Sequence, residues 1–258
     1  MAYAMNKVDY PVLNPEEVAE IYYQGYVDAL KCIWYPPVTE PRFIRPEEFN
    51  IEYYQDFLDK MASSANSDVL SNKGVAHASL LSATLLRNTN NSLLMYTDFR
   101  PDLLCGKRER SGQGFEGIYW YEFKKFFKER LKSGCFRPES VKIILKNDDY
   151  IDNEPIRIIS EALNCAETCD KIVIYKATPA ARAQVEEILG RQEDKEESHY
   201  DFSVYDTNMF RLEFEADTYK SLASFNCTLW SSILTDFINY APERFKLENI
   251  TEFIRNKH

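Results

Sequence analysis

The sequence predicts an α/β fold in which a mainly parallel or mixed sheet is flanked by helices. Between residues 92 and 190, short apolar runs typical of buried strands alternate with amphipathic helical patterns. Strand–helix alternation with short links is typical of parallel strands covered by helices on both faces. A pair of period-2 runs after residue 200 adds a β-ribbon. Apolar residues make up 45% of the 258 residues, which is enough for one large core.

The first part of the chain predicts helices without strands. Asn14 and Pro15 are typical of a helix start, and the prolines from Pro36 onward end that helix. A second helix follows a proline-rich connector and ends at the polar break of residues 63–74. A third helix covers about residues 74–88. These patterns divide the chain into an N-terminal helical extension (1–73), an α/β domain (74–241) and a C-terminal tail helix (242–258).

The α/β domain is defined by three strand–helix repeats. The strands are predicted at 92–97, 140–147 and 171–177, and the helices at 117–134, 153–164 and 178–190. In the last helix, Thr178 is the predicted N-cap, Pro179 takes the first position and Gly190 ends the helix. A closing helix is predicted over 228–240, with Pro242 ending it because proline removes a backbone donor.

Ligands of such sheets bind beyond the carboxyl ends of the strands. The first of these ends, at Asp98, opens into a long loop over residues 101–117 that is rich in basic side chains. The candidate binding residues there are Arg100, Lys107, Arg108 and Arg110. Two interpretations stay open: an anion-binding lid, or a solvated loop without a ligand. A generic domain that binds a small anion near Arg100 and Thr178 is therefore one functional alternative.

The ribbon predicted after residue 200 separates apolar from ionisable side chains. Phe202 and Val204 alternate with polar residues, and a turn at Thr207-Asn208 leads into a second alternating run. Alternation puts the apolar side chains on one face and the polar ones on the other. The polar face contains His199, Asp201, Ser203, Tyr205, Arg211 and Glu213. This face is either a functional site or a set of surface ion pairs.

The order of these elements, followed by Ala223–Asn226 and a helix, resembles the phospholipase D-like superfamily over about residues 75–240. The family signature is H-x-K-x4-D followed by G-S-x-N. His199 and Asp206 have the family's His and Asp spacing, and Ser224 and Asn226 match the second element. The resemblance implies that His199 is the nucleophile that accepts the phosphoryl group, and that Ser224 and Asn226 position the phosphate.

The sequence departs from this signature at the lysine, which binds the phosphate in that family. Asp201 stands at the lysine position, Ala223 stands at the glycine position, and the gap between the two elements is longer by about ten residues. An acidic side chain repels a phosphodiester and cannot stabilise its transition state. We therefore expect a degenerate, non-catalytic domain that acts as a binding or regulatory subunit, in a nucleic-acid-processing or defence assembly. The alternative is an active phosphodiesterase or nuclease that uses His199, which requires a homodimer because active members pair two motifs.

Composition restricts the partners. The net charge of −10 disfavours a nucleic-acid coat, although the basic loop leaves local contact with nucleic acid open. No apolar run approaches the roughly 20 residues that a membrane span needs, and the first residues contain no apolar leader core, so we expect a cytoplasmic protein. The six scattered cysteines predict reduced thiols. We expect no cofactor and no metal, and a homodimer or a larger complex.

Overall fold

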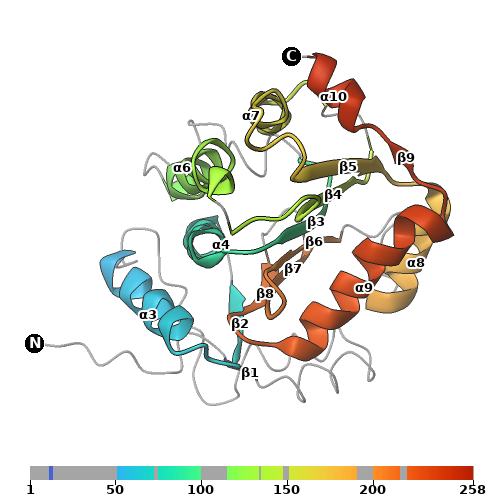
Figure 1. The fold of residues 1–258 in the computed structure, drawn as a ribbon. Helices are drawn as coiled ribbons and strands as arrows, with labels where there is room; N and C mark the ends of the chain where they lie inside the picture. The colour runs from blue at the N-terminus through green and yellow to red at the C-terminus, as the bar shows by residue number, and fades with distance from the viewer. Residues whose placement is uncertain are drawn as a thin grey trace, which may run out of the picture.

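The chain folds around one mixed sheet with helices on both faces (Figure 1). The computed structural model describes residues 12–13, 51–72, 75–99, 115–133, 135–147, 151–190, 200–215 and 220–257. Within these ranges the sheet has nine strands in the order β1-β2-β8-β7-β6-β3-β4-β5-β9. The predicted α/β class, with a mixed sheet flanked by helices, is confirmed.

One half of the sheet is parallel. Strands β3 (Leu93–Thr97), β4 (Val141–Leu145) and β5 (Ile172–Lys176) lie side by side in the predicted places. All five residues of β3 are buried, which explains its continuous apolar sequence, because a strand covered on both faces has no solvated side. The short β9 (Glu248–Asn249) extends this half by pairing antiparallel with β5.

The other half is antiparallel. Strand β6 (Asp201–Tyr205) pairs with β3 and forms a hairpin with β7 (Met209–Glu215), as the alternation predicts. β8 (Lys220–Ser224) pairs with β7, β2 (Val69–Asn72) with β8, and β1 (Val12–Leu13) with β2. Neither β8 nor β2 follows from the sequence. Both are short and contain serine or asparagine among their few apolar residues, so their pattern resembles that of a loop.

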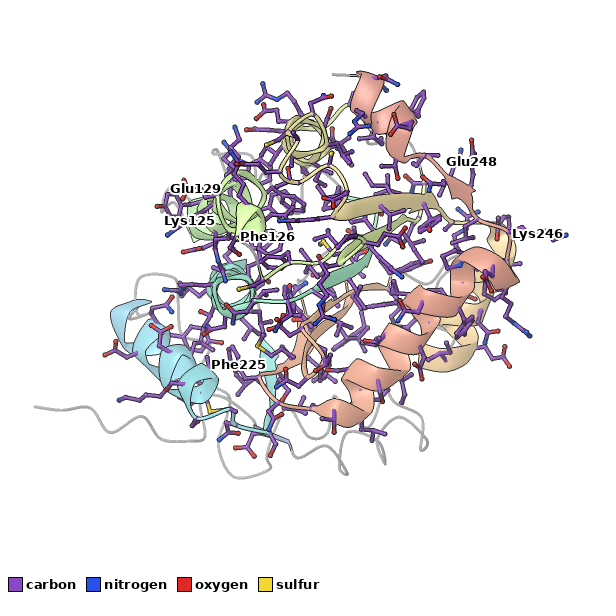
Figure 2. The ribbon with its side chains drawn as sticks, in the orientation of Figure 1. Lys125, Phe126, Glu129, Phe225, Lys246 and Glu248 are labelled. Carbon is purple, nitrogen blue, oxygen red and sulfur yellow. The ribbon has the colours of Figure 1, made fainter. Side chains whose placement is uncertain are left out.

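The helices form two layers. On one face lie α3 (Ile51–Ser63), α4 (Val75–Asn88), α6 (Phe115–Lys128), the short 3₁₀ helix Arg130–Lys132, α7 (Glu154–Leu163) and α10 (Thr251–Lys257). On the opposite face lie α8 (Pro179–Leu189) and α9 (Thr228–Arg244). Each layer has its own apolar core. Phe126 and Phe225, labelled in Figure 2, both belong to the core under α4 and α6.

The prediction that Pro242 ends the closing helix is wrong. Helix α9 continues through Pro242 to Arg244. A proline in the last turn removes one donor, but its carbonyl and that of Ala241 still accept hydrogen bonds, from the backbone N–H groups of Leu247 at 3.0 Å and Phe245 at 2.9 Å. The N-cap of α8 is as predicted, because the Thr178 hydroxyl accepts a hydrogen bond from the Ala181 N–H.

Candidate functional site

The ribbon sorts its side chains by face as predicted. Phe202 and Val204 lie in the core under α8 and α9, together with Phe210 and Leu212 of β7. Asp201, paired with Glu213 in the register, belongs to the opposite face. That polar face is not exposed to solvent, because α4 and α6 cover it. The ionisable groups that the sequence places there are therefore enclosed between helices and sheet.

These groups line a cavity of about 70 Å³. Its floor is made by β3, β6 and β7, and its roof by the first half of α4 and by Tyr119 of α6. The polar side chains in its wall are Ser79, Ser82, Thr97, Tyr119, Asp201, Ser203, Tyr205, Arg211 and Glu213. The volume is sufficient for a few water molecules or a small ligand group. We call this space the ribbon cavity.

Arg211 and Glu213 form an ion pair in the wall of the ribbon cavity. The Arg211 Nη2 donates to Glu213 Oε2, and their side chains are 14% and 6% exposed. Burial raises the pKa of Glu213, and the Arg211 charge counteracts only part of that effect. Burial acts to lower the pKa of Arg211, but the nearby Glu213 carboxylate raises it overall. The Arg211 Nε–H is buried and has no hydrogen-bond partner in the described part of the chain.

A second charged group lies at the carboxyl ends of β3 and β4. Lys146 Nζ is 2.5 Å from Asp201 Oδ1 and 3.4 Å from Asp98 Oδ2. Burial opposes the charged form of Lys146, but the two carboxylates outweigh it and raise the pKa of the lysine. The acid at the signature's lysine position is therefore neutralised by a lysine at the end of β4, two strands away in the sheet. Sequence reasoning missed Lys146, because it follows a strand and nothing local connects it to residue 201.

Asp206 has a structural role in the hairpin. Asp206 adopts a backbone φ of +55° in the turn between β6 and β7, a conformation that aspartate tolerates. Its carboxylate accepts hydrogen bonds from the backbone N–H groups of Asn90 at 3.1 Å, Asn91 at 2.7 Å and Ser92 at 3.1 Å. Its own N–H donates to the Ser92 carbonyl at 2.8 Å. Asp206 thus fastens the ribbon to the connection between α4 and β3, away from the ribbon cavity.

Ser224 and Asn226 lie at the Asp206 end of the ribbon. Ser224 pairs in register with Phe210 and Val69, so it belongs to the α9 face of the sheet, opposite to Asp201. The Ser224 hydroxyl accepts from the Asn226 N–H at 3.2 Å, and the Asn226 Oδ1 accepts from Asn208 Nδ2 at 3.2 Å. Three residues along the strand and two strand spacings separate Ser224 from Asp201, a distance of about 14 Å at ordinary sheet dimensions.

Strand β7 explains this separation. Each antiparallel strand reverses the chain, so an added strand places the next segment at the opposite end of the ribbon. The longer gap between the two signature elements is filled by β7, and Ser224 therefore arrives beside the turn that contains Asp206. The structure brings together Asp201, Arg211 and Glu213, and it does not bring Ser224 or Asn226 to them.

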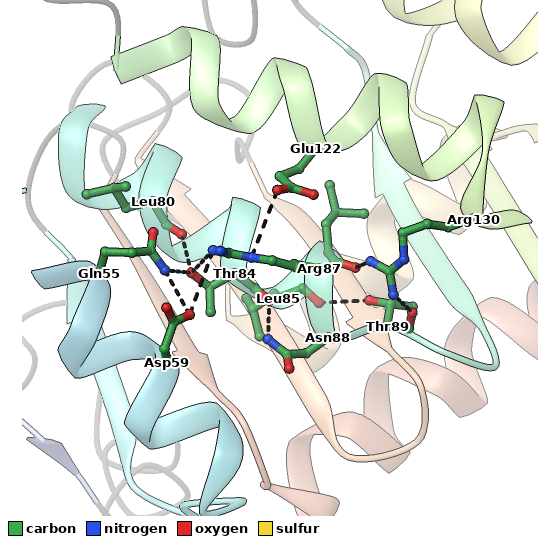
Figure 3. Close-up of polar contacts among 11 residues, drawn as sticks. Gln55, Asp59, Leu80, Thr84, Leu85, Arg87, Asn88, Thr89, Glu122 and Arg130 are labelled. Carbon is green, nitrogen blue, oxygen red and sulfur yellow. Dashed lines mark hydrogen bonds and ion pairs between the residues drawn. The ribbon is translucent and has the colours of Figure 1, made fainter. Parts of the chain in front are cut away.

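Helix α4, the roof of the ribbon cavity, is held by polar contacts on its outer side (Figure 3). Gln55 of α3 donates to the Thr84 hydroxyl at 3.1 Å, and Arg87 lies 3.8 Å from Asp59 and 3.9 Å from Glu122 of α6. At the end of α4, Arg130 donates to the carbonyls of Leu86 and Thr89. These contacts fix α4 between α3 and α6, so the serines of its inner side have a defined position over the ribbon.

The other predicted site residues lie outside the described residues. These are His199, Arg100, Lys107, Arg108 and Arg110. Within the described ranges, no three His, Cys, Asp or Glu side chains come together in a way that could hold a metal ion. In the same ranges, no helix combines the length and apolar character needed to cross a membrane.

Comparisons with known proteins add little. No protein-family model matches the sequence, and no curated protein is significantly similar to it. Among solved structures, the chain is similar to one described as the structure of TrmBL2, an archaeal chromatin protein, that shows a novel mode of DNA binding. The TM-score is 0.42 at 11% sequence identity, and the match covers 92% of this chain and 71% of that one. At this level the likeness carries no argument about function.

Proposed function

We propose that the chain is a non-catalytic binding module on a phospholipase D-like scaffold, and that the ribbon cavity is its ligand site. The module would act as a homodimer or as a subunit of a larger assembly, in nucleic-acid processing or defence. The assembly and its context rest on the family resemblance alone. The ligand site rests on the cavity itself, because a largely preformed polar and apolar recess is the usual form of a small-molecule site.

The observation that carries the proposal is the placement of Ser224 on the face opposite to Asp201. Phosphoryl transfer through a covalent intermediate needs the nucleophile and the groups that hold the phosphate within hydrogen-bond reach of one reacting atom. Ser224 and Asn226 instead bond to each other and to Asn208 beside the hairpin turn. Strand β7 therefore places the second signature element away from Asp201, which stands at the lysine position of the first.

The charge arrangement supports the same proposal. A transition-state clamp for a phosphodiester requires cations that are aimed at the reacting group. In this chain Lys146 is engaged by Asp201 and Asp98, and Arg211 is engaged by Glu213. Cations already paired with buried carboxylates offer little further stabilisation to a developing negative charge. A site of this kind is suited to holding a ligand with few charges.

Turnover assays test the proposal. The purified full chain is incubated with bis-p-nitrophenyl phosphate, single-stranded DNA, RNA and phospholipid vesicles, beside a His199→Ala preparation. We expect no turnover above that of the variant. Phosphodiester cleavage that disappears in His199→Ala would overturn the proposal in favour of a homodimeric phosphodiesterase.

A charge-exchange variant sharpens the test. Asp201→Lys combined with Lys146→Asp restores the signature lysine and keeps an opposite charge at both positions. If the misplaced Ser224 and Asn226 prevent catalysis, this variant also remains inactive. Its secondary structure is compared with that of the wild-type chain by circular dichroism, and turnover by a folded exchange variant would refute the argument from β7.

A further inference from the structure

Arg211 has a hydrogen-bond donor that the protein does not use. Its Nη2 donates to Glu213, whereas its buried Nε–H has no partner in the described part of the chain. Arg211 is also part of the wall of the ribbon cavity. An unpaired N–H on a buried charged group is costly, and such groups are commonly satisfied by a ligand or by ordered water. The partner that is missing is an acceptor, so a ligand here is expected to present an oxygen.

The wall of the ribbon cavity offers further donors for that oxygen-bearing group. Ser79 and Ser82 lie three positions apart on α4, on the same side of the helix, and both line the cavity. Both are buried, and the polar contacts of α4 with α3 and α6 hold their helix in place. A guanidinium N–H with neighbouring hydroxyl groups is an arrangement that suits a carboxylate or another oxyanion.

The local charges favour an oxyanion with a single negative charge. Glu213 already shares the Arg211 guanidinium, and Asp201 lines the same cavity. A group with two charges, such as a phosphomonoester, would have only the shared charge of Arg211 to offset it, because Lys146 is already paired with Asp201 and Asp98. A carboxylate carries one charge, and one of its oxygens can accept from the free Arg211 Nε–H while the other accepts from a hydroxyl group. The small volume of about 70 Å³ also limits the bound group to a few heavy atoms.

We propose that the ribbon cavity binds the carboxylate of a small monocarboxylic acid, held by Arg211 Nε and by the hydroxyls of Ser79 and Ser82. This inference names the ligand class of the proposed binding module and rests on that proposed function. The bound carboxylate lies close to Glu213, so the two acids share the site best when one of them carries a proton. Binding therefore takes up a proton.

The groups that face Glu213 make it the site of that proton. Arg211 and Asp201 face it from β7 and β6, Tyr119 faces the cavity from α6, and Lys146 acts from the end of β4. Burial already raises the pKa of Glu213, and a second carboxylate beside it raises that pKa further. Affinity for the acid is thus expected to increase as the pH falls.

Thermal denaturation of the full chain measures binding through the ligand-induced shift in melting temperature. The probes are sodium acetate and sodium propionate, with sodium chloride at equal ionic strength, acetamide as the neutral analogue of acetate, and sodium phosphate. We expect a saturable upward shift with acetate and propionate, larger at about pH 6 than at about pH 8, and none with acetamide or chloride.

Variants assign the effect to residues. Arg211→Lys keeps a cation beside Glu213 but lacks the Nε–H, and it should weaken acetate binding about tenfold or more. Glu213→Gln should remove the pH dependence. Ser231→Ala is the matched control, because the hydroxyl of this buried serine has no hydrogen-bond partner in the described ranges and Ser231 lies in α9, on the other face of the sheet. It should bind acetate as the wild-type chain does.

Three outcomes would overturn the inference. These are a shift with phosphate but not with acetate, no shift with any anion, and an Arg211→Lys variant that binds acetate with unchanged affinity. None of these results bears on the turnover assays, so the proposed non-catalytic function does not depend on them. Cleavage that depends on His199 would instead remove the proposed function, whatever acetate does.

Discussion

Asp206 offers the sharpest test of how the ribbon is held, because one carboxylate serves three backbone donors. In Asp206→Ala, the N–H groups of Asn90, Asn91 and Ser92 lose their acceptor. The N–H groups of Asn90 and Asn91 are exposed, so water replaces the carboxylate and each lost bond lowers the free energy of unfolding by about 0.5 kcal/mol. The Ser92 N–H is part-buried, and the loss of its acceptor lowers that free energy by about 1.5 kcal/mol. Alanine at φ +55° adds about 1 kcal/mol. Together these effects should lower the free energy of unfolding of Asp206→Ala by about 3.5 kcal/mol.

Asp206→Asn is the comparison that separates charge from conformation. Asparagine tolerates the same backbone conformation and keeps one oxygen as acceptor, so it should lose only the charge assistance, about 1 kcal/mol. Urea denaturation followed by circular dichroism gives both values, and the alanine variant should melt about 7–14 °C below the wild-type chain. If the free energy of unfolding of Asp206→Ala is within about 0.5 kcal/mol of the wild-type value, or if the two variants are equally destabilised, Asp206 does not hold the ribbon in the way described.

Two further predictions concern Lys146 and Thr178. Lys146→Met leaves Asp98 and Asp201 without their shared cation and should destabilise the chain by about 3–5 kcal/mol at neutral pH. Because the folded-state pKa of Lys146 is raised above 10.5, its contribution is complete below that pH and is lost as the pH rises through the folded value. In alkaline melts the difference in stability between the wild type and Lys146→Met should therefore stay constant up to about pH 10 and narrow above it. A difference that already narrows well below about pH 10 would contradict the ion-pair account. Thr178→Ala removes the acceptor for the Ala181 N–H and should cost about 1 kcal/mol in urea denaturation, whereas a change at the neighbouring exposed Ala180 should cost nothing measurable.

The fold class and the two faces of the ribbon could be predicted from the sequence because both depend on local periodicity. Alternation in β6 and β7 is sufficient to assign Phe202 and Asp201 to opposite faces. The same holds for β3, whose apolar run indicates a strand buried on both sides. Neither inference requires knowledge of a distant partner.

The composition of the site could not be predicted, because it depends on pairings between distant segments. Lys146 meets Asp201 only because β3 lies between β4 and β6 in the sheet. Ser224 is local to a recognisable motif, yet the direction of its strand decides which face and which end of the ribbon it occupies. A sequence motif reports spacing along the chain, and one additional strand is enough to make that spacing misleading about distance.

The pairing of β2 with β8 has a consequence for how the chain folds. Residues 69–72 find their partner at residues 221–224, so this part of the sheet closes only after most of the chain has been synthesised. Contacts between such distant segments slow folding, because the intervening loop must close before they form. Until then the edge of β2 that later meets β8 is unpaired, and unpaired edges invite association with other chains. We therefore expect nascent chains that end before β8 to associate with one another more readily than the folded protein does.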